Sequence, residues 1–208
     1  SLSVLPVVKA INIQISTTEF SGQSSDKIHP KIKETGKRLV VIYILITLTE
    51  ALILSLGGMS VFDAVCHSFS TMSTGGFCTH NDGLASFSSP FIKVVITFFM
   101  FTAGTNLTII YFGLKGNFRK IFSNNEFNYY LIICFVFSVI VSIILQQKTG
   151  QTGKSIVDGT FHVISIITTT GFYTNDYNLW SSFLILILFI LMFTGGTAGS
   201  TSGGIKVV

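Results

Sequence analysis

The chain has 208 residues, of which 49% are hydrophobic and only 11% are charged, and its net charge is +4. Soluble domains carry about 25% charged residues, so this composition, with a mean hydropathy of +0.67, excludes an ordinary soluble domain and indicates a membrane protein. Three cysteines without a Cys-x-x-Cys pair give no sign of a disulfide framework or a zinc site.

Four apolar stretches follow one another along the chain. Residues 1–38 form a cytoplasmic or interfacial lead-in, whose apolar start resembles the tail of a preceding helix. A membrane-crossing helix needs about 20 apolar residues. We therefore expect the stretches at 39–56, 91–112 and 127–145 to cross, whereas the stretch at 180–194 reaches only partway before a glycine-rich segment begins.

The positive charges are distributed unevenly between the loops. Ten of the 13 lysines and arginines fall before the first span, in the 113–126 loop or at Lys206. Because cytoplasmic loops are enriched in lysine and arginine, the N-terminal segment and the 113–126 loop are predicted to be cytoplasmic. Solvated loops beside anionic lipid explain these charges, and no element for reading nucleic acid accompanies them.

The sequence contains an internal repeat. Residues 62–79 (FDAVCHSFSTMSTGGFCT) correspond to residues 157–174 (VDGTFHVISIITTTGFYT) at a constant offset of 95 positions. The shared residues include an Asp, a His, a Ser and a Thr-x-Gly-Phe-x-Thr motif. Downstream, MFTAGT at 100–105 corresponds to MFTGGT at 192–197. Such a repeat predicts two similar units around a common axis, which in a membrane often holds a pore or transport site.

Each unit contains a segment too short to cross the membrane. Residues 62–73 and 157–168 have 12 residues each, or about 18 Å of helix at 1.5 Å per residue. We expect both segments to enter from outside, stop at mid-membrane and return as extended chain. The predicted fold is an all-α membrane protein with tandem membrane-helix/pore-loop/membrane-helix repeats, at 39–112 and 127–208, of a potassium-channel-like kind.

The Thr-Gly segments after these short helices have the chemistry of a cation pathway. Glycine lets successive carbonyls turn toward one axis, and a helix C-terminus favours a cation. Carbonyl rings replace the hydration shell of a monovalent cation. The predicted ion-binding residues are Ser73, Thr74, Gly75, Gly76, Thr168, Thr169, Thr170 and Gly171. The alternative, a helix contact made of small residues, is weakened because the motif occurs in both repeats.

Other polar residues in the apolar segments leave choices open. Asp63 with His67, and Asp158 with His162, are four residues apart, which permits a metal site but favours hydrogen bonds that anchor the short helix. Glu50 lies in the middle of the first span and faces either another helix or the outer vestibule. Phe77 and Phe172 are predicted packing anchors behind the Thr-Gly segments.

The segments STMSTGGFCTH (70–80), ITTTGFYTNDY (167–177) and MFTGGTAGSTSGGIKVV (192–208) resemble the Trk/Ktr/HKT superfamily of potassium transporters, most closely its TrkH-type membrane subunit. The resemblance implies four pore-loop repeats around one potassium pathway, of which this chain carries what look like the second and third. It places the filter glycines at Gly76 and Gly171, with bound potassium at 74–76 and 169–171. Potassium is then a substrate, and no cofactor is implied.

The resemblance also implies partners and a gate. Such subunits are multi-pass proteins of the inner (plasma) membrane, work as homodimers, and associate with a cytosolic nucleotide-binding regulatory subunit. The glycine-rich loop at 194–204 corresponds to a loop that obstructs the pore, although Ser202 stands where glycine is expected. The predicted gate residues are Gly195, Gly196, Thr197, Gly199, Ser200, Thr201, Gly203 and Gly204.

The sequence also predicts where the outgoing helices break. Five glycines after residue 194 disfavour a helix there, since each glycine costs about 1 kcal/mol relative to alanine. We expect this break to be specific to the second unit and the helix to continue past Lys206. The residues around Gly104 in the first unit are less glycine-rich, and an uninterrupted span is expected there.

The predicted function is potassium uptake through this filter and gate. A less selective potassium and sodium transporter is one alternative, and a broken-helix secondary transporter for a small solute is another, although the latter needs inverted rather than parallel repeats. No nucleophile–base pair or complete metal ligand set is recognisable, so an enzyme is not expected.

Overall fold

The computed structural model describes residues 32–87, 89–175 and 180–207 of the chain. Most of the predicted lead-in, at 1–31, lies outside the described residues. The elements in chain order are α2 (Ile32–Leu56), α3 (Val61–Met72), η1 (Gly83–Ser86), α4 (Pro90–Ala103), α5 (Leu107–Leu114), α6 (Phe118–Phe122), α7 (Asn125–Thr149), α8 (Thr152–Ile167), α9 (Ser182–Leu191), β1 (Thr194–Thr197) and β2 (Ile205–Val207). The predicted all-α class is confirmed, with two short strands added.

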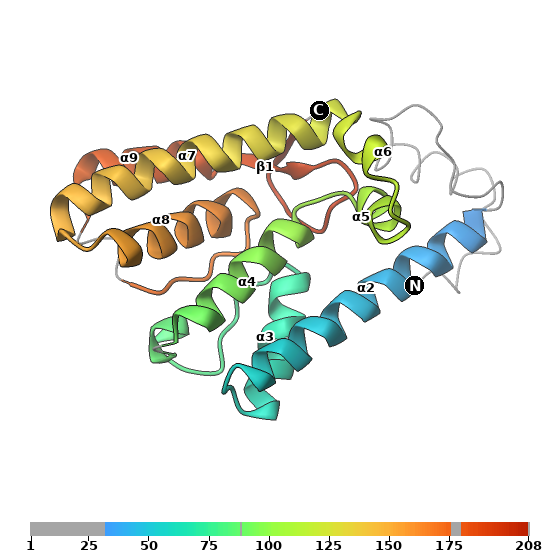
Figure 1. The fold of residues 1–208 in the computed structure, drawn as a ribbon, viewed down its shortest axis with the longest axis horizontal. Coiled ribbons are helices and arrows are strands. Elements are labelled where there is room, and N and C mark those ends of the chain that lie inside the picture. Colours follow the sequence, from blue (N-terminus) through green and yellow to red (C-terminus); the bar gives the residue numbers. More distant parts are fainter. Residues whose placement is uncertain (1–31, 88, 176–179, 208) are drawn as a thin grey trace.

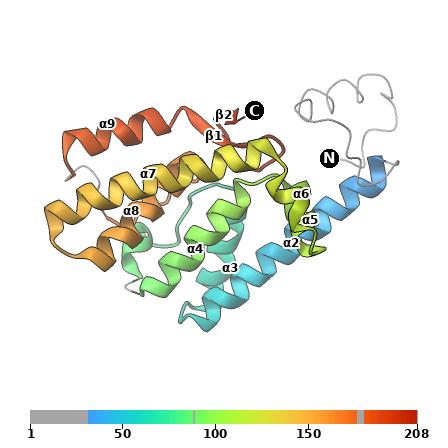
Figure 2. The same cartoon turned by 45° about the horizontal axis from the view of Figure 1, so that its top comes forward.

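The elements form two units that lie side by side (Figure 1). The first unit contains α2, α3, α4 and α5, and the second contains α7, α8, α9 and the two strands, with α6 between the units. Helix α4 contacts both α2 and α8, so it lies at the junction of the units (Figures 1 and 2). The parallel order of incoming helix, short helix and outgoing helix agrees with the sequence repeat.

Among the described residues, two single helices are long and apolar enough to cross a membrane. These are α2, over Gly36–Leu56, and α7, over Asn125–Thr149. The start of α7 is capped by Asn124, whose side-chain oxygen accepts a hydrogen bond from the Phe127 amide at 3.0 Å. It ends at Gly150, which takes the left-handed conformation (φ 69°) that terminates many helices. Both spans extend beyond their predicted ranges by polar turns.

The predicted uninterrupted span over 91–112 is wrong. The chain bends by 111° between α4 and α5, at the short segment Gly104–Asn106. Asn106 caps α5 by accepting a hydrogen bond from the Thr108 amide at 2.8 Å, which fixes a new helix start. Gly104 lies against Tyr130 and Thr168, where a side chain would collide with both. One glycine, with a capping asparagine, is therefore enough to break this helix.

The short helices of both units occupy similar places. Helix α3 begins after Ser60, whose hydroxyl accepts from the Asp63 amide at 3.1 Å. Helix α8 has 16 residues and begins at Thr152, before the expected position 157. Its additional turn contains exposed polar residues, including Lys154. At 1.5 Å per residue the two helices measure about 18 and 24 Å, shorter than the roughly 30 Å hydrocarbon layer.

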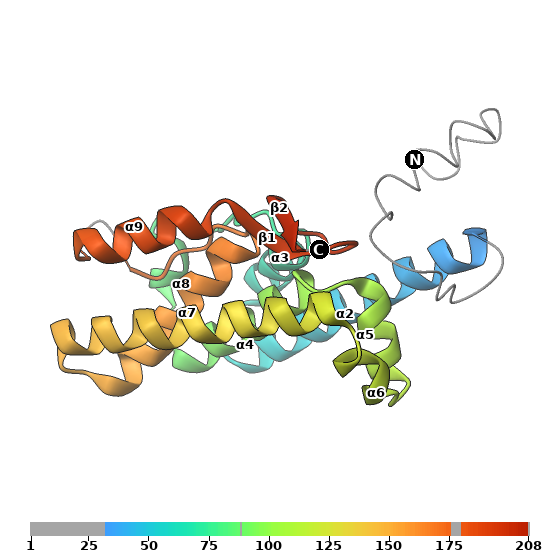
Figure 3. The ribbon, with the colours of Figure 1, turned by 90° about the horizontal axis from the view of Figure 1, so that it is seen from above.

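The last apolar segment forms the expected short helix that stops before the glycine-rich loop, but the chain after the loop is not helical. Helix α9 has 10 residues and stops at Leu191, and β1 and β2 then pair in parallel around the glycine-rich loop. Figure 3 shows this loop extending from the end of α9 over the middle of the molecule. The expected continuation of a helix past Lys206 is wrong within the described residues, because Ile205–Val207 form β2.

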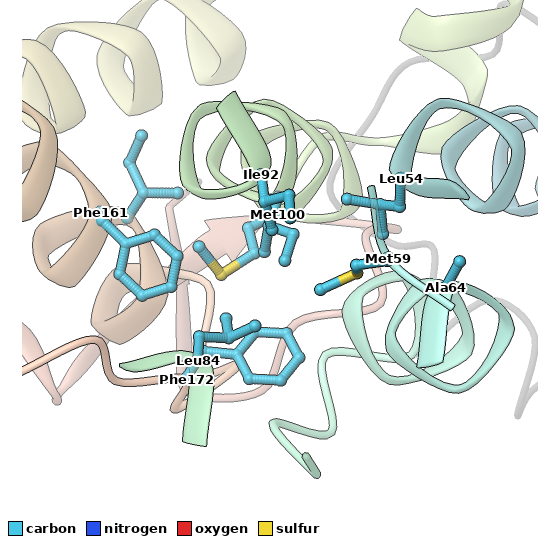
Figure 4. Close-up of a cluster of buried hydrophobic side chains, with 10 residues drawn as sticks. Leu54, Met59, Ala64, Leu84, Ile92, Met100, Phe161 and Phe172 are labelled. Carbon is cyan, nitrogen blue, oxygen red and sulfur yellow. The ribbon is translucent and has the colours of Figure 1, made fainter. Parts of the chain in front are cut away.

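A hydrophobic cluster joins the two units behind the Thr-Gly segments (Figure 4). Met100 of α4 lies between Leu54 of the first unit and Phe161 of the second, and Leu84 and Phe172 pack against them. Leu54, Leu84, Met100 and Phe161 are fully buried. This contact fixes the distance between the two units and hence between their Thr-Gly segments.

We expect Phe161→Ala to lower the melting temperature of the detergent-purified full-length protein by separating the units. Loss of a buried phenylalanine costs about 3–5 kcal/mol because it leaves a cavity. The matched control is Phe135→Ala on α7, a residue that is 67% exposed and lies outside the cluster. Equal melting temperatures of the two variants would contradict the role given to this cluster.

Candidate functional site

The Thr-Gly segments begin where the short helices end. The residue that caps α3 is Ser73 and the one that caps α8 is Thr168, and both have helical torsions. The chain then turns back on the helix end. The Gly75 amide donates to the Ser70 carbonyl at 2.8 Å, and the Thr170 amide donates to the Ser165 carbonyl at 2.9 Å. Because these bonds occur at matching positions of the repeat, both segments leave their helices in the same way.

Left-handed torsions occur at the same positions of both segments. Thr74 has φ 52° and Thr169 has φ 55°, and these are the only non-glycine residues with positive φ in the described chain. Two positions later, Gly76 has φ 69° and Gly171 has φ 82°. A β-branched residue in this region is a genuine outlier, and such a conformation costs about 1–3 kcal/mol. Its presence in both repeats points to a functional constraint on the backbone.

The two segments lie against each other. A Cβ atom built on Gly76 would overlap the carbonyl oxygen of Thr170 and would lie 3.3 Å from the carbonyl carbon of Gly171. A Cβ atom on Gly171 would meet nothing within 4 Å. Within the described residues, no hydrogen-bond donor reaches the carbonyl oxygens of residues 74–76 or 169–171. These carbonyls are therefore available to a cation or to water.

The remaining residues of the predicted ion-binding set lie behind or beside these carbonyls. Ser73 is exposed at the helix end, where its hydroxyl donates to the Ser70 carbonyl at 3.4 Å. Thr168 is fully buried, and its hydroxyl lies 2.8 Å from both the Ile164 carbonyl and the Thr170 hydroxyl. Thr168 and Thr170 thus support the second segment through their side chains.

The two phenylalanines after the glycines differ in their surroundings. Phe172 is buried and stacks on His67 of the first unit, with ring centroids 6.0 Å apart. Phe77 is 81% exposed, so the expectation of a packing anchor is wrong for this residue in the chain as described. The reason is geometric: the first unit covers Phe172, whereas no described element lies on the corresponding side of the first unit.

The aspartates and histidines of the short helices do not pair through their side chains. Instead, His67 Nδ1 lies 2.7 Å from the Asp63 backbone oxygen, and His162 Nδ1 lies 2.8 Å from the Asp158 backbone oxygen. Among the described residues, no group of three or more His, Cys, Asp or Glu could hold a metal. The anchoring interpretation fits this geometry better than the metal interpretation.

Each aspartate instead bonds to the chain that leaves the Thr-Gly segment. The Thr79 hydroxyl donates to Asp63 at 2.7 Å, and the Thr174 hydroxyl donates to Asp158 at 3.3 Å. Lys93 of α4 forms an ion pair with Asp158 at 3.1 Å. Sequence reasoning missed these threonines and this lysine as partners, although the repeat conserves both the Asp and the Thr between the two units.

Glu50 is fully buried, and its carboxyl lies beside Thr71 of α3. Of the two positions left open by the sequence, the structure therefore places this side chain against the short helix and not in an outer vestibule. Thr71 donates its own hydroxyl to the His67 carbonyl at 2.8 Å.

The glycine-rich loop is held against the first unit. The Thr197 amide donates to the Gly104 carbonyl at 3.0 Å, and the Thr201 hydroxyl donates to the Ala103 carbonyl at 3.0 Å. Side chains at two of the loop glycines would be obstructed, because a Cβ on Gly196 would overlap the Gly104 carbonyl and one on Gly195 would overlap the Gly203 carbonyl. The loop thus uses carbonyls that the break after α4 has released.

The same loop contacts both Thr-Gly segments. The Thr74 hydroxyl donates to the Thr201 carbonyl at 3.0 Å, and the Gly203 amide donates to the Thr169 hydroxyl at 2.6 Å. The two threonines are the matched residues with positive φ. Of the predicted gate residues, Thr201 and Gly203 make these two bonds. The others lie elsewhere on the loop: Gly196 and Thr197 against Gly104, Gly199 against Asn106, and Gly195, Ser200 and Gly204 against other loop residues.

Ser202, the departure from the expected glycine, has a structural role. Its hydroxyl accepts a hydrogen bond from the Gly196 amide at 3.0 Å, which closes the base of the loop. The Lys206 ammonium group donates to the hydroxyls of Ser202 and Ser200 at 3.2 and 3.3 Å, and also to the Ser202 carbonyl. A glycine at 202 would lose the hydroxyl contacts and keep the carbonyl.

Comparison with known proteins gives consistent matches. The family model TrkH, described as cation transport protein, matches residues 1–208. The Trk system potassium uptake protein TrkH of Escherichia coli is 35% identical over 212 residues, covering 100% of this chain and 44% of that protein. The corresponding protein of Halomonas elongata is 32% identical and also covered to 44%. The chain thus spans less than half the length of these relatives.

A solved structure agrees with these matches. The crystal structure of the potassium transporter TrkH from Vibrio parahaemolyticus superposes with a TM-score of 0.81 at 32% identity, covering 88% of this chain and 40% of that one. The family match over the whole chain, together with the transmembrane helices and the paired Thr-Gly segments, shows that this chain belongs to the TrkH family of cation transport proteins.

Proposed function

We propose that this chain forms half of a potassium-conducting pathway, with residues 73–76 and 168–171 as filter segments. The observation that carries the proposal is the matched backbone: left-handed torsions at Thr74 and Thr169 and at Gly76 and Gly171, with carbonyls that accept no bond from described residues. Backbone of this kind at membrane depth is tolerated where it lines water or is buried in protein. The relatives' potassium-uptake names support potassium as the substrate.

The conducting assembly needs more than this chain's two segments. A ring of carbonyls around an ion requires about four strands, as in potassium channels. The resemblance supplies the further repeats, and the relatives are more than twice as long as the aligned chain. We place the protein in the inner membrane as a multi-pass subunit of a homodimer, regulated by a cytosolic nucleotide-binding subunit. The system name of the relatives supports an assembly of several components.

The glycine-rich loop is the proposed gate. It lies on the filter threonines and on the broken end of α4, so its removal would open the path below the filter. Its contacts with the Thr-Gly segments and with the bend after α4 are hydrogen bonds, and none of its residues belongs to the hydrophobic cluster between the units. A partner could therefore shift the loop without unfolding the hydrophobic cluster between the units.

The substitution Gly76→Ser should abolish rubidium uptake or lower the pathway's preference for rubidium over sodium by about tenfold. A tenfold change corresponds to about 1.4 kcal/mol. The added side chain would overlap the Thr170 carbonyl, and the left-handed backbone disfavours it. Gly171→Ser should act through its torsion alone and less strongly, since its Cβ meets open space. Uptake of both ions by the full-length protein in liposomes measures this.

The matched control for the filter variants is Gly150→Ser. Gly150 has the same φ as Gly76, 69°, and a Cβ there meets nothing within 4 Å, but it caps α7 far from the filter along the chain. It should keep the wild-type ion preference. Rubidium-over-sodium uptake that stays unchanged in both filter variants would refute the filter assignment.

Deletion of residues 197–202 should raise the basal rubidium flux and weaken its dependence on the regulatory partner. A milder variant, Thr201→Val, removes the hydroxyl bond to the Ala103 carbonyl and should have a smaller effect in the same direction. Thr102→Val is its control, because the Thr102 hydroxyl donates to the Phe98 carbonyl of its own helix. Wild-type flux with intact regulation after the deletion would exclude this loop as the gate.

A further inference from the structure

Each short helix carries an aspartate that accepts a hydrogen bond from a threonine beyond the filter segment. We call each pair a brace: Asp63 with Thr79 in the first unit, and Asp158 with Thr174 in the second. Asp63 and Thr79 are separated by 16 positions, as are Asp158 and Thr174. In each unit the enclosed chain contains the C-terminal part of the short helix and the filter segment. The carboxylate, from the first turn of α3 or the middle of α8, therefore ties the helix to the chain that leaves the filter, and closes the segment into a loop.

The two braces differ in their second partners. Asp63 is completed within its own unit, because the Ser60 hydroxyl donates to it at 2.7 Å and His80 lies 3.7 Å away. Asp158 accepts from the Asn175 side chain at 2.6 Å and pairs with Lys93, which belongs to the first unit. Only the second brace therefore joins one unit to the other.

Burial makes the second brace rigid. The side chains of Lys93 and Asp158 are 13% and 3% exposed, whereas that of Asp63 is 16% exposed and that of His80 is 45% exposed. A buried ion pair holds its geometry because removing one partner leaves an uncompensated charge in a low-dielectric site. The Lys93 ammonium group of α4 is thus fixed against α8, the helix that positions the second filter segment.

We infer that Lys93, Asp158 and Thr174 form an inter-unit brace that sets the separation of the two filter segments and thereby the ion preference of the pathway. The brace rests on the proposed filter function. Lys93 belongs to α4 of the first unit, Asp158 to α8, and Thr174 to the chain that leaves the second filter segment after Phe172. Because the filter segments touch at Gly76 and Thr170, a small shift between the units alters the carbonyl cage directly. These three are positioning residues and contact no ion.

The test compares rubidium and sodium uptake by the full-length protein in liposomes. Lys93→Met and Asp158→Asn should each lower the rubidium-over-sodium ratio roughly fivefold or more, and the double variant should lower it no further, because contacting groups act as one unit. Lys154→Met is the matched control. It removes an exposed lysine from the first turn of α8 and should leave the ratio unchanged.

Thr174→Val guards against variants that fail to fold. It keeps the buried ion pair, removes only the hydroxyl that ties the outgoing chain to Asp158, and should also lower the ratio. A wild-type ratio in these variants, or a parallel loss of both fluxes with the ratio unchanged, would overturn the brace. If the wild-type protein itself showed no preference for rubidium, and Gly171→Ser changed nothing, the proposed filter function would fail and the brace with it.

Discussion

The constraint on which this structure depends is the need to satisfy backbone polar groups inside a membrane. An unpaired carbonyl or amide in hydrocarbon is costly, so extended chain at that depth must be buried in protein or must line water. The two Thr-Gly segments, which we propose lie at that depth, have amides that turn back onto the preceding helix ends. The carbonyls of residues 74–76 and 169–171 accept no hydrogen bond from the part of the chain that the structure describes. Because the same arrangement occurs in both repeats, these carbonyls are a property of the repeated unit and not a local irregularity.

Repetition explains the backbone, but the side chains around it differ between the units. Ser165 donates to the Phe172 carbonyl at 2.7 Å, whereas its counterpart Ser70 has no such bond. Phe172 is covered by the first unit, and Phe77 is exposed. The second segment is thus held by more contacts than the first in the described chain. An additional unit with the same geometry beside the first would cover Phe77 as the first unit covers Phe172.

The sequence was sufficient for features that depend on spacing and composition. The offset of 95 located both short helices and the Thr-Gly segments that follow them, and the glycine density located the break after α9. It was insufficient where a single local interaction determines the backbone path or the contact between the units. The bend at Gly104 depends on a single glycine packed against Tyr130 and on the Asn106 cap, and neither stands out in an apolar stretch. The pairing of Lys93 with Asp158 depends on how the two units meet, which no pattern within either unit specifies.

The two helix breaks pair each other's backbone hydrogen-bonding groups. The bend after α4 frees the Ala103 and Gly104 carbonyls, and the glycine-rich loop after α9 supplies the donors Thr197 and Thr201 that they need. Neither break would be stable alone in an apolar environment, since each would leave unpaired polar groups. It follows that the loop cannot leave this position unless water replaces it on those carbonyls. Opening of the proposed gate and entry of water into the path beneath the filter therefore happen together. The position of this polar loop thus controls whether a conducted ion finds water on the inner side of the filter.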